Sequence, residues 1–476
     1  MRRITLRLSL AFVLTAFCAQ SAAARVQNPC APAAPQTPKP LAVKTFKLDS
    51  AQEAALEIEA RSPGASWARK GFEAAALVVT VDGAYNQDVL LWAGAEFYRY
   101  RILLGRLPKG SHTVSVALNE ARSAAGARRA EVKSLSPVSP SAVPPAGAAP
   151  DSNEVDFTVI PLEVAPVSVQ EQNFAVAHAP VLYARPNTFD HFTDVPLLMY
   201  YEVLREGAET VYRYTVIFTN EDGGTQTAAL FARWGRGTDI EWVYEVRLRG
   251  GKVVAETFQG VRHETKDFRG QRTGGGHPLL AVASDNNNFS DLACSAVRFA
   301  PLPVRARLAA ATRESVMDAV PQTYRAMYEE LLREGRISDT PADINTVADP
   351  REYLYVEAAS EQTGAAVAFD VKVGGRDDVF RSDMGEPRLR IERSGYYRTA
   401  VRLPKGVAPD AVESISARCH THPATAAGGT CARLKLVRVL TLGSDFTPRA
   451  LPHQAHPEAS LAAGESKLFR LAPAAP

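Results

Sequence analysis

The sequence lacks most of the signatures by which a function is recognised. It contains no G-x-S-x-G nucleophile motif, and its Gly274-Gly275-Gly276 run is not followed by the Lys-Ser/Thr pair of a phosphate-binding loop. An excess of one charge is also missing, because 54 Lys and Arg residues are balanced by 52 Asp and Glu residues. Such a balance provides no field that attracts nucleic acid, so a nucleic-acid partner is not expected.

Long hydrophobic runs are scarce as well. The first residues read Met1-Arg2-Arg3, followed by an apolar run from Leu8 to Phe17 and a cluster of small residues that ends at Ala24. This pattern predicts a cleavable export signal. A membrane anchor is the alternative, but the run is shorter than the ~20 residues that span a bilayer. We therefore expect a periplasmic or extracellular protein whose mature chain has no membrane span.

Cysteine is rare, with 5 residues in the chain. Removal of the signal takes Cys18 and leaves four, an even number that favours disulfides in an exported protein. Cys419 and Cys431 enclose a glycine-rich loop, so we expect a disulfide between them, with Cys30 and Cys294 as the remaining pair. Zinc held by Cys419, Cys431, His420 and His422 is the alternative, although the histidines do not have zinc-finger spacing.

Helical periodicity is limited, whereas 32 prolines and 31 glycines separate many short strand-like runs. This pattern predicts a mostly β, multidomain chain, in which two β-sandwich modules flank a central β-rich domain with a short helical segment. The helical segment is expected to form two helices, over 305–320 and 323–336, separated by Pro321. The predicted parts are a signal peptide (1–24), a flexible leader (25–42), a β-sandwich (43–133), a Pro/Ala/Ser linker (134–152), the central domain (153–301), the helical segment (302–350), a second β-sandwich (351–450) and a loose tail (451–476).

A short internal repeat links the two predicted sandwiches. The run R-L-P-K-G occurs at 106–110 and again at 402–406, each time after a tyrosine-rich strand. A strand that ends in a Gly turn precedes both copies. We interpret the sandwiches as two copies of one fold, with an incidental strand-to-turn motif as the alternative.

The richest stretch of polar residues runs from Tyr214 to Asn288. Along its strand-like run T-D-I-E-W-V-Y-E-V, period-two alternation places Asp239, Glu241 and Glu245 on one face. The other face then holds the apolar residues Ile240, Trp242, Tyr244 and Val246. Neighbouring carboxylates repel unless a cation, an arginine or a shared proton compensates, so such pairs are common at functional sites. Salt bridges to Arg233, Arg236 or Arg247 are the alternative explanation.

Histidines and carboxamides follow this strand. Imidazole and carboxylate suit zinc, and carboxylate and amide oxygens suit calcium, but no spacing matches a named metal motif, so a divalent metal stays an open possibility. His277 precedes Pro278, which is also typical of a turn or core histidine. The candidate catalytic residues are Asp239, Glu241, His263 and His277. The candidate ligand-binding residues are Trp234, Arg236, Asn286, Asn287 and Asn288.

Two further features of the same stretch have plainer interpretations. The run N-E-D-G-G-T at 220–225 resembles part of a calcium loop but lacks the closing glutamate, and it is expected to form a hairpin turn. Aromatic residues could stack on sugar rings, although part of this set is expected in the core. These aromatic residues are Tyr212, Tyr214, Trp234, Trp242 and Tyr244.

The stretch from His178 to Asn288 resembles the vacuolar-protein-sorting-like domains of plants and microbes. The likeness rests on His178-Ala-Pro-Val-Leu182, the acidic run that contains Asp239 and Glu241, and His277-Pro278. The His-Gly pair of the family's H-x-G-D-W-E run is missing here. The resemblance implies a secreted or peripheral β-rich domain and no established reaction.

Together these patterns predict an exported ligand-binding protein, most plausibly for a glycan of the envelope or surroundings. The alternative is a secreted hydrolase with a carboxylate and histidine site in the central domain. A purely structural envelope component is the third hypothesis. The oligomeric state does not follow from the sequence.

Overall fold

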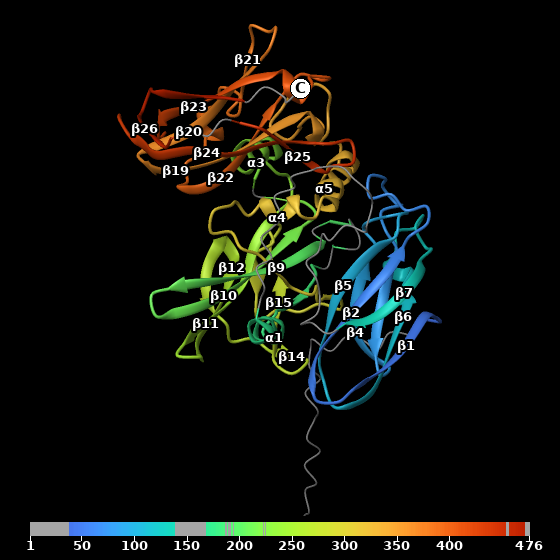
Figure 1. The fold of residues 1–476 in the computed structure, drawn as a ribbon. Helices are drawn as coiled ribbons and strands as arrows, with labels where there is room; N and C mark the ends of the chain where they lie inside the picture. The colour runs from blue at the N-terminus through green and yellow to red at the C-terminus, as the bar shows by residue number, and fades with distance from the viewer. Residues whose placement is uncertain are drawn as a thin grey trace, which may run out of the picture.

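The computed structural model describes residues 38–138, 168–185, 188, 192, 193, 195–221, 223, 225–453 and 457–471. The predicted fold class is confirmed, because the chain is mostly β and forms several sheets with few helices. The N-terminal sandwich lies beside the central domain, and the C-terminal sandwich covers one end of it (Figure 1). The predicted export signal and Cys30 lie outside the described residues.

The N-terminal sandwich consists of a four-stranded and a three-stranded antiparallel sheet. Alternating apolar residues such as Leu56, Ile58, Leu77 and Val79 fill the core between the sheets. The last strand continues to Val138, so it includes the first residues of the predicted linker. The order of the four-stranded sheet is β1 (Pro40–Leu48), β6 (Gly110–Leu118), β3 (Ala76–Val81), β4 (Ala84–Leu90). The order of the three-stranded sheet is β5 (Tyr98–Leu107), β2 (Gln52–Arg61), β7 (Glu131–Val138).

The central domain is built on one large mixed sheet of eleven strands. Long antiparallel hairpins form one half of it, and short strands from distant loops form the other half. The order is β17 (Arg298–Phe299), β8 (Val181–Tyr183), β15 (His277–Val282), β16 (Phe289–Ser290), β12 (Lys252–Gly260), β11 (Ile240–Arg249), β10 (Glu209–Phe218), β9 (Pro196–Glu206), β18 (Val304–Arg305), with β13 (Glu264–Asp267) on β12 and β14 (Arg272–Thr273) on β15.

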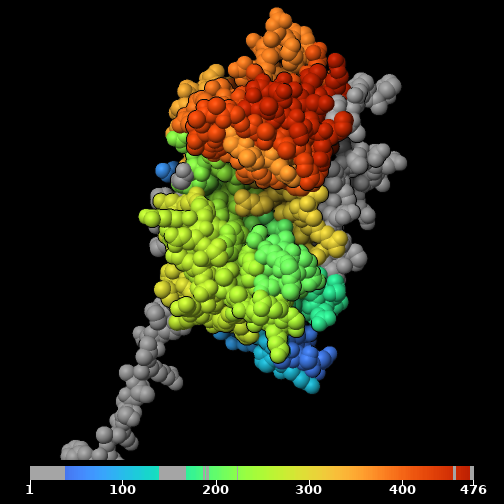
Figure 2. All heavy atoms as spheres, turned by 90° about the vertical axis from the view of Figure 1, so that its left-hand side faces the viewer, coloured from blue at the N-terminus to red at the C-terminus, as the bar shows by residue number. Residues whose placement is uncertain are grey.

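The described helices are short. They are α1 (Val169–Ala177), α3 (Thr227–Trp234), α4 (Ser315–Asp318) and α5 (Gln322–Arg333). Three of them lie between the central sheet and the C-terminal sandwich, where yellow helical residues separate the green and red parts of the molecule (Figure 2). The helix predicted over 323–336 is confirmed as α5. The helix predicted over 305–320 is wrong for most of its length, because only α4 is α-helical there and Val304–Arg305 joins the central sheet.

The C-terminal sandwich also pairs two sheets around an apolar core. The predicted disulfide between Cys419 and Cys431 is confirmed and joins one sheet to the other, with a Cα–Cα distance of 6.0 Å. Cys294 is disulfide-bonded too. The prediction of a loose tail after residue 450 is wrong for 459–470, because β26 and β27 add to the two sheets. The order of the first sheet is β22 (Gly395–Arg402), β19 (Tyr353–Thr363), β24 (Thr430–Leu442), β25 (Pro448–Leu451), and β26 (Ala459–Ala462) also pairs with β24. The order of the second sheet is β21 (Val379–Arg381), β20 (Ala365–Val373), β23 (Val412–Thr421), β27 (Ser466–Arg470).

The two sandwiches have the same strand order. In the first, β5-β2-β7 packs against β1-β6-β3-β4; in the second, β22-β19-β24 packs against β27-β23-β20-β21. Each R-L-P-K-G run connects the same two positions, from β5 to β6 and from β22 to β23, and so crosses between the sheets. The edge strands differ in their place in the chain. β1, beside β6, is the first strand of its sandwich, whereas β27, beside β23, is the last strand of its sandwich.

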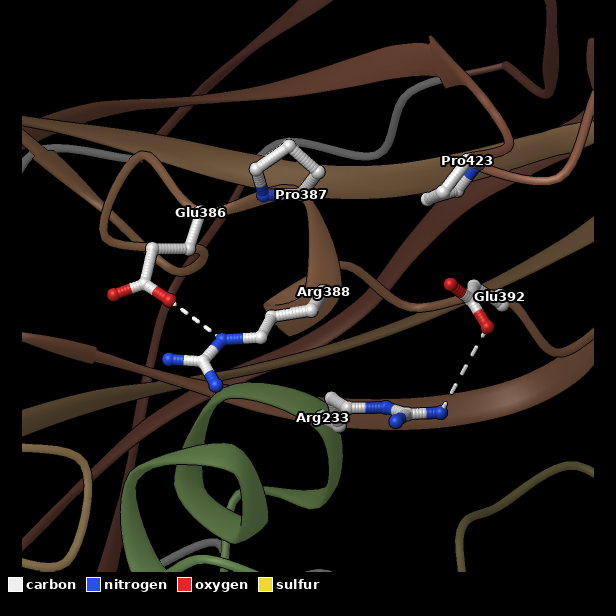
Figure 3. Close-up of a pocket in the computed structure, with 6 residues that line it drawn as sticks. All are labelled: Arg233, Glu386, Pro387, Arg388, Glu392 and Pro423. Carbon is white, nitrogen blue, oxygen red and sulfur yellow. Dashed lines mark hydrogen bonds and ion pairs between the residues drawn. The ribbon is translucent and has the colours of Figure 1, made fainter. Parts of the chain in front are cut away.

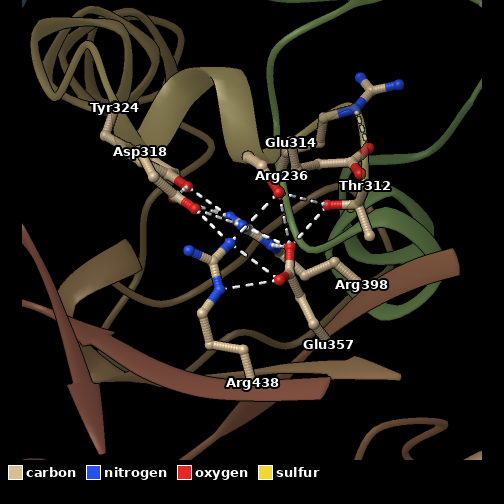
Figure 4. A network of polar contacts seen from close by, with 9 residues as sticks. Arg236, Thr312, Glu314, Asp318, Tyr324, Glu357, Arg398 and Arg438 are labelled. Atoms are coloured by element: carbon tan, nitrogen blue, oxygen red, sulfur yellow. Dashed lines mark hydrogen bonds and ion pairs between the residues drawn. The ribbon is translucent and has the colours of Figure 1, made fainter. Parts of the chain in front are cut away.

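An ion-pair network lies under the helices that support the C-terminal sandwich (Figure 4). Arg398 on β22 contacts Asp318 of α4 at 2.6 Å and Glu357 of β19 at 2.7 Å. Arg438 on β24 contacts the same two carboxylates at 2.6 and 2.8 Å. The Tyr324 hydroxyl donates to Asp318 Oδ1 at 2.6 Å. We call Asp318, Glu357, Arg398 and Arg438 the guanidinium network, in which two positive charges balance two negative charges.

Candidate functional site

Four segments of the central domain meet where its long strands end. They are the connection from β10 to α3, the start of β11, the end of β12 with the turn after it, and the loop from β15 to β16. Phe218 N donates to Asp239 O at 2.9 Å, and Gly260 pairs with Phe289. Strand pairing therefore brings together residues that are up to 67 positions apart, between Glu221 and Asn288.

Strand β11 presents its acids differently from the simple alternation. A β-bulge at Val243 shifts the register, because Tyr214 pairs with Tyr244 and Thr215 with Trp242. Ile240 packs in the core beside the helices, whereas Tyr244 packs in the other core, on the opposite side of the sheet. The prediction of one continuous apolar face was wrong for this reason. Glu245 consequently lies away from Asp239 and Glu241 and pairs with Arg213 and Arg247 at 2.5 and 3.3 Å.

Three carboxyl groups are buried together at this end of the sheet. Asp239 and Glu221 are 2% and 3% exposed, and the Glu241 side chain is 12% exposed. Burial, followed by the charge of Glu241, raises the pKa of Asp239 to about 7. Burial, followed by the charge of Asp239, raises the pKa of Glu221 to about 7, and burial also raises the pKa of Glu241. We call these three residues the carboxylate cluster, in which burial and like charge favour the protonated form of each member.

Neutral amides hold the carboxylate cluster. Asn287 Nδ2 donates to Asp239 Oδ2 at 3.0 Å, and Gln259 Nε2 donates to Glu241 Oε2. With its amide oriented to satisfy both neighbours, Asn286 donates to Glu221 Oε1 at 2.6 Å and accepts from His263 Nε2 at 2.9 Å. Each carboxyl group thus has a carboxamide donor, which orients it without supplying a compensating charge.

His263 connects the cluster to the surface. Gln259 Nε2 donates to its Nδ1 at 2.8 Å, so Nδ1 carries the lone pair and Nε2 the proton. Nδ1 lies 3.7 Å from Glu241 Oε2, and the imidazole is 53% exposed. The backbone of the turn is strained, with φ of 65° at Arg262 and 60° at His263. Asn288 Oδ1 accepts from Arg262 N at 3.2 Å and stabilises this turn. Strain in non-glycine residues is common at functional sites.

His277, the second predicted histidine, is not at this site. It is buried, its Nδ1 contacts Ala179 O at 2.9 Å, and its Nε2 contacts Glu53 Oε2 of β2 at 3.0 Å. Nearby, Gly274 O accepts from Arg106 N of the first R-L-P-K-G turn at 2.9 Å. His277 therefore ties the central domain to the N-terminal sandwich, because the β14–β15 hairpin that carries it lies against that sandwich.

The other predicted ligand-binding residues separate into two groups. The three asparagines Asn286–Asn288 are at the carboxylate cluster, as described. Arg236 is buried, and its Nε donates to Glu314 Oε1 at 3.1 Å. It lowers the pKa of Glu221 and Asp239 less than burial raises it. Trp234 instead lies beneath the guanidinium groups of Arg233 and Arg393.

The alternative of a salt-bridged acidic face holds for Glu245, which pairs with Arg213 and Arg247, but not for Asp239 and Glu241. Arg236 pairs with Glu314, Arg247 with Glu206, Glu209 and Glu245, and Arg233 approaches Glu392. Within the described chain, no guanidinium group donates a hydrogen bond to a carboxylate oxygen of the cluster. Across the same residues, no group of three or more His, Cys, Asp or Glu side chains is arranged to hold a metal ion.

Two residues of the site were missed from the sequence. Glu221 was assigned to a hairpin turn, but the chain passes through it from β10 into α3, and Thr225 N donates to Glu221 Oε1 at 2.8 Å. Its acidic neighbours in N-E-D-G-G-T were the available signal. Gln259, in F-Q-G, has no such signal. The proposed sugar platform also loses its tyrosines, because Tyr212, Tyr214 and Tyr244 are buried in the core.

Comparisons with known proteins do not assign this chain to a family. Among the described residues no helix is long and apolar enough to cross a membrane. No protein-family model matches the chain, and no curated protein matches it significantly. The geometry of the carboxylate cluster is therefore the main evidence from which a function can be argued.

Proposed function

We propose that the protein is an exported hydrolase that uses the carboxylate cluster and His263 for general acid–base catalysis. The observation that carries this proposal is the pKa of about 7 of two buried carboxyl groups whose hydrogen-bond donors, among the described residues, are neutral amides. A general acid or base works best when its pKa lies near the operating pH. Carboxylates with a structural role are instead usually neutralised by arginine, as in the guanidinium network.

The exposure of each group suggests its role. Glu241 is the most exposed of the three carboxyls and lies next to the solvent-exposed His263, so it is the group expected to contact substrate. Asp239 and Glu221 are buried behind it and act as positioning residues that keep a proton within the cluster. Gln259 bridges Glu241 and His263 and sets their relative orientation.

A glycan is the substrate class to test first. Most glycoside hydrolases pair a protonated carboxyl group with an ionised one. The protonated group donates its proton to the leaving oxygen. The ionised group takes a proton from the water whose oxygen bonds to the sugar carbon. Carboxyl groups with a pKa of about 7, as in Asp239 and Glu221, supply both forms near neutral pH, and the predicted export would place the cluster beside envelope glycans.

The experiment compares Glu241→Gln and Asp239→Asn with Glu245→Gln in the purified full chain. Glu245 is the matched control, because it is a buried glutamate of the same strand outside the cluster. Release of reducing ends is followed across a panel of glycans that includes peptidoglycan. We expect Glu241→Gln to lower the rate by about 10²- to 10⁴-fold, the usual contribution of a general acid or base. Glu245→Gln should retain the rate, and the wild-type rate should peak near pH 7.

Other outcomes would contradict the hydrolase proposal. Binding to a glycan without its hydrolysis would favour the simple glycan-binding function. Neither binding nor hydrolysis across the panel would favour a structural envelope component. Equal losses in Glu241→Gln and Glu245→Gln would indicate a general effect on the fold.

A further inference from the structure

A cavity of about 510 Å³, broadly open to solvent, lies where helix α3 meets the C-terminal sandwich (Figure 3). Its walls combine charged and proline side chains from the helix, from the segment before β22 and from the loop after β23. The lining residues are Arg233, Glu386, Pro387, Arg388, Glu392 and Pro423. It is separate from the carboxylate cluster, because the two share no residue.

The two arginines of the cavity differ in how they are neutralised. Arg388 Nε donates to Glu386 Oε2 at 2.7 Å, which is a complete ion pair. Arg233 Nη2 is 4.0 Å from Glu392 Oε2, too far for a hydrogen bond, and Glu392 is also 3.5 Å from His422 Nε2. Arg233 Nε is buried and has no hydrogen-bond partner in the described chain. The charge of Arg233 is therefore poorly compensated.

A second arginine adds to this positive charge. Arg393, next to Glu392, places its guanidinium group 5.2 Å from the centre of the Trp234 ring, and Arg233 lies 4.8 Å from the same ring. Among the described residues Arg393 forms no ion pair with a carboxylate. Burial, and the charges of Arg313, Arg236 and Arg233 against that of Glu314, lower the pKa of Arg393 to about 10. Glu314 is already paired with Arg236.

We infer that the cavity binds an anionic group, a carboxylate or a phosphate, at Arg233, and that Arg393 adds positive charge nearby. Both guanidinium groups lie close to the Trp234 ring, and the Nε donor of Arg233 has no hydrogen-bond partner among the described residues. A planar guanidinium binds carboxylate and phosphate oxygens through paired, charge-assisted hydrogen bonds. The anion would supply the hydrogen-bonded acceptor that Glu392, at 4.0 Å, does not provide for Arg233. This inference does not depend on the proposed hydrolase activity.

Calorimetric titration of the full chain with inorganic phosphate and with acetate, at constant ionic strength, tests the site. We expect saturable binding of at least one anion, and the preferred anion identifies the ligand chemistry. Arg233→Gln should weaken it by about 10- to 100-fold, the effect of losing one charge-assisted hydrogen bond. Arg393→Gln should weaken it less, because it removes only a neighbouring positive charge. Arg388→Gln is the matched control and should change it little, because Glu386 already satisfies that arginine.

Glu392→Gln gives a prediction of opposite sign. It removes the carboxylate that competes for Arg233 and repels an anion, so binding should become tighter. This variant also tests the site if an arginine variant fails to fold. The inference is overturned if neither anion binds saturably, if Arg388→Gln weakens binding as much as Arg233→Gln, or if Glu392→Gln weakens it.

Discussion

Two clusters of buried acidic residues in this protein differ in the groups that neutralise them. In the guanidinium network, two arginines donate to two carboxylates, and their charges lower the pKa of Glu357 to about 2 in spite of its burial. In the carboxylate cluster, amides take the place of the arginines and the pKa of Asp239 rises to about 7. Equal burial therefore gives opposite titration behaviour, and the neutralising partner decides whether a buried acid stabilises the fold or stays available for chemistry.

A second comparison connects the two sandwiches. Arg398 pairs with Glu357 across β22 and β19, and Arg101 pairs with Glu57 across β5 and β2, at the equivalent place in the shared strand order. Arg101 Nε lies 2.9 Å from Glu57 Oε2, but the side chains are 18% and 19% exposed. The corresponding exposures of Arg398 and Glu357 are 0% and 2%. The same cross-strand pair is thus a partly exposed contact in one sandwich and part of a helix-covered network in the other.

The largest expected effect comes from breaking the network. Arg398→Met should lower the free energy of unfolding by about 3 to 5 kcal/mol, because it leaves two buried carboxylates short of a partner. Arg101→Met, its control in the first sandwich, should cost about 0 to 1 kcal/mol. Urea denaturation of both variants measures the difference. Similar losses would show that the helices over the second pair do not change its energetics.

Removing the disulfide should have the next largest effect. Replacing Cys419 and Cys431 together by serine should lower the free energy of unfolding by about 3 kcal/mol on the loop-entropy model. The loss should appear in the C-terminal sandwich, whose two sheets the bond joins. The comparison is denaturation of the wild type and the double variant without reductant, because a reductant would also break the disulfide of Cys294. A stable, unchanged C-terminal sandwich in the variant would contradict the prediction.

The last prediction sharpens the comparison through the dependence of stability on pH. The folded pKa of Asp239 is raised from 3.8 to about 7, so its stabilising protonation is complete below about pH 4 and is lost as the pH rises through 7. Asp239→Asn keeps the shape of the side chain but cannot ionise, so the variant does not lose this stability as the pH rises. Relative to wild type it should therefore gain stability between pH 5 and pH 8, by up to about 1.4 kcal/mol for each unit of pKa shift.

Glu357 gives the opposite sign in the same measurement. Its folded pKa is lowered from 4.5 to about 2, so its contribution is present above pH 4.5 and is lost as the pH falls toward 2. Urea denaturation of wild type and Asp239→Asn from pH 2 to pH 8 covers both titration ranges and separates the two clusters. If Asp239→Asn lost the same stability at every pH, the lost hydrogen bond to Asn287 would explain it and the raised pKa would not.

Several parts of the fold and site follow from local patterns. Period-two runs between Gly and Pro turns predicted the sandwiches, and the dense polar stretch predicted that Asp239, Glu241, His263 and Asn286–Asn288 lie at one place. The bulge at Val243 could not be predicted, since one extra residue in a strand leaves no mark on its composition. The strands β26 and β27 were missed because they are short and mostly exposed, and they pair with strands that lie far from them in the chain or across a loop.

The sequence by itself determined which side chains are available: alternating apolar residues for two sandwiches, two cysteines around a glycine-rich loop, and acids among amides in the central domain. Only the tertiary structure decided which acids receive a guanidinium partner. Glu357 meets Arg398 and Arg438, whereas Asp239 meets Asn287. A pKa depends on desolvation and on charges a few ångströms away, and those neighbours come from strands and loops tens of residues apart in the chain.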